Sequence, residues 1–129
     1  MLKTIQSRDV SAPKTAYSQA ILAQGSKLLF ISGQVPVDKE GKLVGEGDFR
    51  AQAHQVFRNL QANLEAGGAS WDSVAKLTVL LTDMENFPIF NEVRQEYLQP
   101  DYPTATAAAI TSLVDPRWMI EIEAVALLD

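Results

Sequence analysis

The stretch from Met119 to Leu127, near the end of the chain, alternates strictly between two sets of positions. One set is apolar throughout: Ile120, Ile122, Ala124 and Ala126. The other set holds Met119, Glu121, Glu123, Val125 and Leu127. A period of two residues is typical of a β-strand with one buried face. Two carboxylates stand on the otherwise apolar second face, and a buried carboxylate needs a partner or a proton. That face is therefore either solvated or part of a site.

A second strand is predicted from Pro103 to Ile110, joined to the first by a loop from Thr111 to Met119. It consists almost entirely of alanine and threonine, whereas ordinary strands favour valine, isoleucine and aromatic residues. Small side chains indicate that something lies close against the strand. A helix packed tightly on the sheet is the simpler interpretation, and a bound ligand is the alternative.

Length, cysteine content, apolar runs and net charge exclude several classes of protein and site. The 129 residues fit one domain, 1–129, which is long enough to bury a core without disulfides or metals. There are no cysteines, so thiol chemistry and thiolate metal sites are excluded. No apolar run approaches the roughly 18 residues of a membrane span, and no signal-like segment is visible, so we expect a cytoplasmic protein. A net charge of −5 without a basic cluster disfavours nucleic-acid binding.

Periodicity predicts the order β-β-β-α-β-α-β-β, an α+β fold with a mixed sheet and both helices on one face. The expected strands before the last two are Leu2 to Ile5, Tyr17 to Ala23, Leu28 to Ile31 and Val74 to Leu81. The first helix follows an Asp48 N-cap and ends at Gly67-Gly68, with its polar face in solvent. The second carries Ile89, Phe90, Val93 and Tyr97 on one side. Gln24-Gly25-Ser26-Lys27 is expected to close a hairpin, with positive φ available at Gly25.

One face of this sheet has no predicted helix to cover it. Strands such as Val74 to Leu81 are apolar on both sides, so an open face would expose a patch too large for a monomer. We therefore expect the chain to form oligomers through its sheet.

Familiar catalytic patterns are scarce. The single histidine, His54, lies within the first helix and is better explained as a partly exposed helix residue than as a catalytic base or zinc ligand. Ser32-Gly33-Gln34 is not a nucleophile elbow. Glu121 and Glu123 remain as candidates for acid–base work or for orienting water.

Six segments taken together resemble the YjgF/RidA family over nearly the whole chain. They are Tyr17-Ser18-Gln19-Ala20, Ser32-Gly33-Gln34-Val35-Pro36, Gln52…Asn59-Leu60…Ala66-Gly67, Asp83…Phe87…Asn91, Tyr102-Pro103 and Ile120-Glu121-Ile122-Glu123-Ala124. The resemblance implies a chorismate-mutase-like fold and a homotrimer whose sheets form a central barrel, with three clefts between subunits. It also implies hydrolysis of reactive enamines and imines to keto compounds and ammonia, without a cofactor.

The resemblance also assigns residues to the cleft. Tyr17, Ser32, Gly33, Phe87 and Asn91 match residues that line it, and Glu121 matches the glutamate that positions the attacking water. Family members that are active hold the substrate carboxylate with an arginine two residues after the proline of the Tyr102-Pro103 motif.

This chain departs from the family at that position. Ala105 stands where the arginine is expected and Ala107 where a cysteine is frequent, and both should face the cleft by strand alternation. Arg94 or Arg117 could enter the cleft from another direction, although surface solvation is the simpler expectation for each.

We therefore expect a deaminase-type hydrolase that acts poorly on simple 2-imino acids. The alternative is a non-catalytic trimer that binds a small, partly apolar molecule in the same clefts. A nucleic-acid enzyme is the weakest interpretation, because the chain is acidic.

Overall fold

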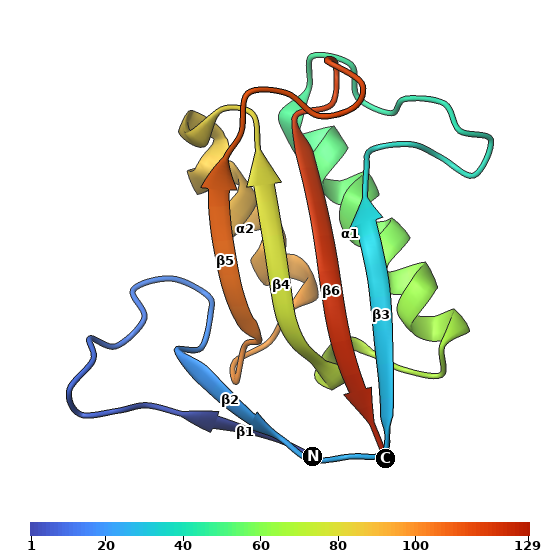
Figure 1. Ribbon diagram of the computed structural model, residues 1–129. Helices are drawn as coiled ribbons and strands as arrows, with labels where there is room; N and C mark the ends of the chain where they lie inside the picture. Colours follow the sequence, from blue (N-terminus) through green and yellow to red (C-terminus); the bar gives the residue numbers. More distant parts are fainter.

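The computed structural model describes all 129 residues, and its main elements follow the predicted order (Figure 1). The strands are β1 (Leu2–Ile5), β2 (Ala20–Ala23), β3 (Lys27–Gln34), β4 (Val74–Leu81), β5 (Thr104–Ala109) and β6 (Ile120–Leu128). The helices are α1 (Phe49–Ala66) and α2 (Phe87–Tyr97), with short 3-10 turns η1 (Trp71–Ser73) and η2 (Met84–Asn86). Both helices lie on one side of the main sheet, so the predicted α+β arrangement is confirmed.

The main sheet has the strand order β3-β6-β4-β5. Its inner strand β6 pairs antiparallel with both β3 and β4, while β4 and β5 run parallel. The predicted alternation of β6 is confirmed, because its four small and apolar residues are buried against the helices while Glu121 and Glu123 belong to the opposite face. Neither helix is long and apolar enough to cross a membrane.

The core lies between the helices and one face of the sheet. Phe57 and Leu60 of α1, with Phe90 of α2, pack over Leu77 and Val79 of β4, and all five are fully buried. The helix start is as predicted, because the Asp48 side chain accepts a hydrogen bond from the Ala51 backbone N–H. At the other end, the positive φ belongs to Gly68.

The polar face of α1 is not simply solvated, and that expectation is wrong. Gln52 is fully buried and its amide Nε2 donates to the carbonyls of Gly45 and Arg117, at 3.0 Å each. Its Oε1 accepts from the Met119 backbone N–H at 2.8 Å. Asn59, seven residues after Gln52 in the helix, donates from its Nδ2 to the Val35 carbonyl. Amide side chains on α1 therefore tie the loops around Val35, Gly45 and Arg117 to the helix.

The start of the chain differs from the prediction. The expected strand from Tyr17 shortens to β2, which pairs only with β1 in a separate two-stranded sheet. Ser18 instead bridges Thr104 of β5, and its hydroxyl donates to the Tyr102 carbonyl. The predicted hairpin at Gly25 is also wrong, because β2 and β3 belong to different sheets and Gly25 does not take a positive φ.

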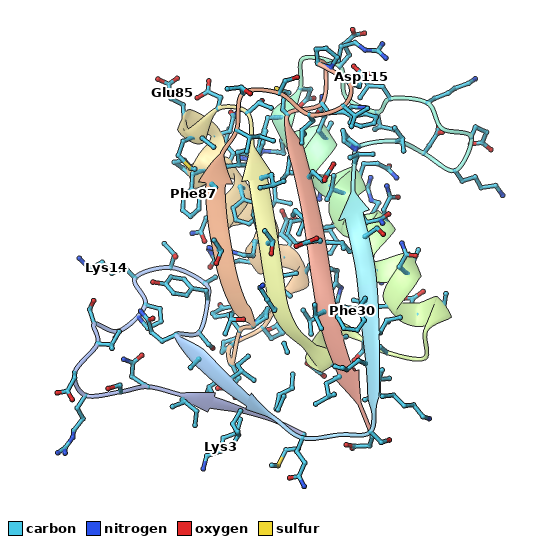
Figure 2. The ribbon with its side chains drawn as sticks, in the orientation of Figure 1. Lys3, Lys14, Phe30, Glu85, Phe87 and Asp115 are labelled. Carbon is cyan, nitrogen blue, oxygen red and sulfur yellow. The ribbon has the colours of Figure 1, made fainter.

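The second face of the main sheet has no helix over it (Figure 1). Leu28 and Phe30 of β3 lie on this open face with 61% and 71% of their surfaces exposed, whereas the next residue, Ile31, is buried under α1. Figure 2 shows Phe30 among the side chains that project from this face. The predicted uncovered apolar face is therefore present in the structure.

Candidate functional site

A pocket of about 410 Å³ opens at the β5 edge of the sheet. Three segments supply its wall: the loop before β2, the η2–α2 junction and β5. Its lining residues are Thr15, Tyr17, Met84, Phe87, Arg94, Ala105 and Ala107. Figure 2 shows Phe87 beside β5, with the Lys14 loop approaching the same edge. Four of the predicted site residues, Tyr17, Phe87, Ala105 and Ala107, thus come together around one cavity.

The alanines of β5 create this space. Ala105 and Ala107 pair in parallel register with Leu77 and Val79 of β4, whose side chains are buried on the helix side. Side chains two residues apart share a face, so both alanines point to that side. The tight helix packing that we considered the simpler explanation of this strand is not found at Ala107, which is exposed and lines the pocket.

The expectation that Arg94 is solvated is wrong, and this residue lines the pocket from α2, the alternative also considered. It is only 2% exposed, and its guanidinium lies 4.8 Å from the ring centre of Phe90 and 5.9 Å from that of Phe87. Its Nη2 donates to Asn91 Oδ1 at 2.5 Å, while Nε is buried without an acceptor. Burial lowers the pKa of Arg94 to about 10, so the group is still charged at neutral pH.

The helical spacing explains this location. Phe87, Phe90 and Asn91 stand seven, four and three residues before Arg94, which puts all four on one side of α2. Asn91, another predicted site residue, therefore acts on the pocket through Arg94. The signal was present in the sequence, because the apolar stripe of α2 continues through an arginine.

A second group of predicted residues lies on β3 and β6. Ser32 and Gly33 form a bulge, since the two residues together face Glu123 alone in the strand register. The Glu121 carboxyl group lies over Gly33, where a Cβ atom would stand 2.7 Å from its Cδ. Partial burial, followed by the neighbouring charge of Glu123, raises the pKa of Glu121.

These two groups are on opposite faces of the sheet. Ala105 and Ala107 share the helix side with Leu77 and Val79, while Glu121 pairs with Leu80 on the open side. The structure therefore brings the predicted site residues together in two sets and does not bring the two sets together within one chain.

Other candidate positions do not join either set. Arg117 is exposed, as expected, and its Nη2 lies 2.7 Å from Asp115 Oδ2. This pairing lowers the pKa of Asp115 to about 2. His54 is partly exposed, also as expected, and its Nδ1 lies 2.8 Å from the Tyr97 hydroxyl. No three His, Asp or Glu side chains gather as a metal site would require.

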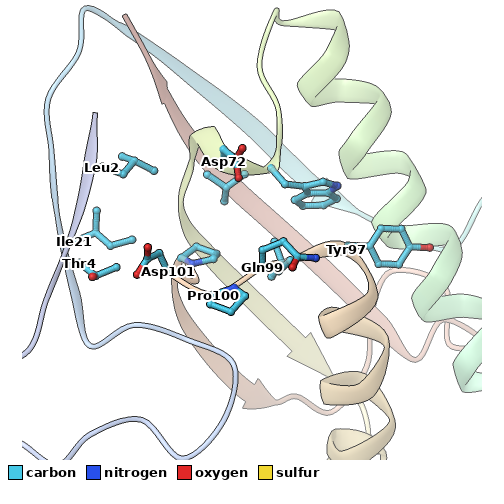
Figure 3. Close-up of a pocket in the computed structure, with 12 residues that line it drawn as sticks. Leu2, Thr4, Ile21, Asp72, Tyr97, Gln99, Pro100 and Asp101 are labelled. Carbon is cyan, nitrogen blue, oxygen red and sulfur yellow. The ribbon is translucent and has the colours of Figure 1, made fainter.

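A smaller cavity of about 180 Å³ separates the β1–β2 hairpin from the segment that follows α2 (Figure 3). Leu2 and Ile21 line it from β1 and β2, and Asp72 and Asp101 are also among its lining residues. None of the predicted site residues lines it, so the pocket at β5 is the better candidate.

Comparison with known proteins gives a consistent result. Residues 8–128 match the family described as Endoribonuclease L-PSP. A RutC family protein of Pyrococcus horikoshii is 42% identical over 127 residues, covering 98% of each chain. The mouse protein named 2-iminobutanoate/2-iminopropanoate deaminase is 36% identical over 126 residues, covering 97% of this chain and 90% of the mouse protein.

Solved structures agree with the sequence relatives. A Rid family protein of Yersinia pestis superposes with a TM-score of 0.86 at 28% identity, covering 98% of both chains. RidA from an Antarctic Psychrobacter gives a TM-score of 0.74 at 35% identity, covering 98% of this chain and 99% of that one. The chain belongs to the YjgF/RidA family, whose family model carries the description Endoribonuclease L-PSP.

Proposed function

We propose that this protein is a hydrolase of the enamine/imine deaminase type, with sites formed between the subunits of a homotrimer. The observation that carries the proposal is the separation of the predicted site residues onto two faces of one sheet. One half is a pocket that opens at the β5 edge, and the other half is a carboxyl group on an uncovered face. The mouse, rat and human relatives named 2-iminobutanoate/2-iminopropanoate deaminase support the reaction class.

The open face supports the assembly. Exposed Leu28 and Phe30 are typical of a surface that another chain covers. When the pocket edge of one copy packs against the open face of the next, Glu121 of one meets Ala105 and Tyr17 of the other. A contact between two different surfaces is heterologous. Such contacts form a ring when the rotation between copies closes, and the smallest such ring is a trimer.

The chemistry follows from Glu121. Hydrolysis of an imine adds water across the C=N bond, and the C–N bond then breaks, so that R₂C=NH and H₂O give R₂C=O and NH₃. In the proposed reaction Glu121 accepts a proton from the attacking water and returns it to the nitrogen, which leaves as ammonia. A raised pKa suits a group that must both accept and donate a proton near neutral pH. The step needs no oxidant or reductant.

The test is the rate of imine loss in a semicarbazide-trapping assay, with imines generated in situ from phenylalanine and from 2-aminobutyrate by an amino acid oxidase. Glu121→Gln should lower the rate by roughly a hundredfold, the usual contribution of a positioned acid–base group. Glu123→Gln is the matched control, because it removes an exposed carboxylate two residues away on the same face. Equal rates for the wild type and Glu121→Gln would contradict the proposal.

Binding without catalysis is the second candidate function. It is favoured by the apolar character that Phe87, Met84, Ala105 and Ala107 give the pocket, and by the lack of a carboxyl group within it. This candidate predicts ligand binding together with no imine turnover by the wild type or by Ala105→Arg. Turnover that depends on Glu121 would remove it.

A further inference from the structure

We propose that Arg94 is the anion-binding group of the β5 pocket, and that the ligand is a carboxylate whose bulky apolar side chain occupies the space over Ala105 and Ala107. The inference rests on the proposed function in one respect, since it takes this pocket as part of the substrate site. It extends that function by naming the cation and the class of substrate. Aromatic or branched 2-imino acids are the class that fits.

Arg94 is a buried charge without a carboxylate partner in the chain. The ion pairs of the chain involve its N-terminus, Arg50, His54 and Arg117, and none involves Arg94. A buried guanidinium without a carboxylate partner is costly, because burial removes its hydration, and here one hydrogen bond and two ring contacts replace only part of it. A carboxylate that enters the pocket would supply the missing partner. The structure thus contains one half of a charge pair, at the wall of a cavity.

The contacts of the Arg94 guanidinium fix its orientation and leave hydrogen-bond donors free. Asn91 holds Nη2, and the rings of Phe87 and Phe90 lie against the guanidinium. These contacts hold the side chain in one orientation without using all its donors, since neither Nε nor Nη1 has an acceptor in the chain. A planar guanidinium with free donors is well suited to a carboxylate. The cation therefore comes from α2 and not from β5, where the family has its arginine.

The small side chains of Ala105 and Ala107 leave space in the pocket for a large apolar group. An arginine at position 105 would extend into the pocket from the strand, whereas alanine leaves that volume empty. The cavity of about 410 Å³ is bounded there by Ala105 and Ala107, and nearby by Met84 and Phe87. A carboxylate held by Arg94 would thus present its side chain to an apolar wall. Burial of apolar surface favours a large side chain over the small one of 2-iminobutanoate.

A measurement of ligand binding tests this inference without depending on catalysis. Isothermal titration calorimetry of the intact protein with phenylacetate, and with its neutral counterpart phenylacetamide, measures the contribution of the carboxylate. We expect phenylacetate to bind the wild type more tightly, and Arg94→Met to lose roughly tenfold to a hundredfold in affinity for phenylacetate only. Arg117→Met is the matched control, because it removes an exposed arginine outside the pocket. It should bind as the wild type does.

Three further variants keep the test independent of the folding of Arg94→Met. Arg94→Lys retains the charge, so it should fold even if Arg94→Met does not, and should keep part of the preference for the carboxylate. Ala105→Leu should weaken phenylacetate binding by about tenfold while pyruvate binding is unchanged. Ala109→Leu, on the same face of β5 but outside the pocket, should leave both affinities unchanged.

Several results would overturn the inference. Equal affinity for phenylacetate and phenylacetamide would do so, as would undiminished phenylacetate binding by folded Arg94→Met. Failure of the wild type to bind phenylacetate at millimolar concentration would also overturn it. Failure of the proposed function gives a different pattern, in which phenylacetate binding depends on Arg94 but no imine is consumed in the trapping assay.

Discussion

Strands β5 and β6 carry the two halves of the candidate site. They differ in their position in the sheet, in the size and charge of their side chains, and in burial. The inner strand β6 has neighbours on both edges, one fully buried face and two glutamates on the other. The edge strand β5 has one neighbour in the sheet, small side chains and a pocket beside it. In the proposed site, the first half supplies acid–base chemistry, and the second supplies space and a cation from the adjoining helix.

This difference shows how one small domain can hold a carboxyl group and a buried guanidinium in two separate environments. Glu121 and Arg94 lie on opposite sides of the sheet, so burial shifts the pKa of each without a charge pair between them. In the proposed trimer, a second copy of the chain brings the two halves into one cleft.

Phe30→Asp should have the largest effect, because it separates the halves. A carboxylate on the open face, at its β3 side, opposes the burial of that face against another chain, so the oligomer should dissociate and imine hydrolysis should fall to background. Light scattering after size-exclusion chromatography should show the mass falling from that of a trimer to 14.2 kDa.

The control for this change is Val114→Asp, which places the same charge on a side chain that is 91% exposed in the β5–β6 loop. It should remain a trimer with full activity. A monomeric Phe30→Asp that still hydrolysed imines at the wild-type rate would show that one chain holds a complete site.

Gly33→Ala should have the next largest effect, and it acts on the β6 half alone. A Cβ atom would lie 2.7 Å from Cδ of Glu121, so the carboxyl group must leave its position over the bulge. We expect a decrease in kcat/KM of roughly tenfold to a hundredfold, with the thermal unfolding midpoint little changed.

A double-mutant cycle gives the control. In Glu121→Gln the carboxylate is already lost, so adding Gly33→Ala should have little further effect. Additive losses would mean that Gly33 acts independently of Glu121.

Ala105→Arg changes the β5 half. It restores a guanidinium on the strand and fills the space over Ala107, so turnover of the imine from 2-aminobutyrate should rise by about tenfold. Phenylacetate binding should fall, because the apolar wall is lost and a second cation lies near Arg94. An unchanged preference for the large substrate would contradict the role given to the two alanines.

The same two strands show what could be predicted from the sequence. The alternation of β6 and the cap of α1 are local patterns, and both were confirmed. The burial of Arg94 was missed because an arginine was read as polar, although its spacing from Phe87 and Phe90 put it on the apolar side of α2. Long-range pairing has no such local signal. The turn at Gly25 does not reveal that β2 pairs with β1 and not with β3.

The separation of the site onto two faces has the same origin. Ala105 and Glu121 both appear in motifs that the family resemblance assigns to one cleft. Their opposite directions follow from the register of β4, which pairs Leu77 with Ala105 and Leu80 with Glu121. Leu77 and Leu80 are three positions apart on one strand, an odd offset, so their side chains point to opposite faces. Register is a tertiary property, and it could be read only from the structure.

The smallest expected effect is a shift in pH dependence that belongs to the β6 half. The pKa of Glu121 is raised first by partial burial and then by the charge of Glu123. The carboxylate form accepts the proton from water, so kcat/KM should rise with pH through a midpoint above the ordinary glutamate value of about 4.3. Glu123→Gln removes the smaller cause, so that midpoint should move to lower pH.

The sign for stability is opposite to that of a salt-bridged carboxylate. A raised pKa means that the folded chain binds more protons than the unfolded chain between the two pKa values, so stability falls as pH rises through that window. Glu121→Gln removes this penalty, and should raise the unfolding midpoint at pH 7 relative to the wild type while changing it little at pH 4. A carboxylate retained for folding would give the reverse. The group that lowers stability is then the one proposed to act on water, as expected where a protein keeps a partly buried charge for its chemistry.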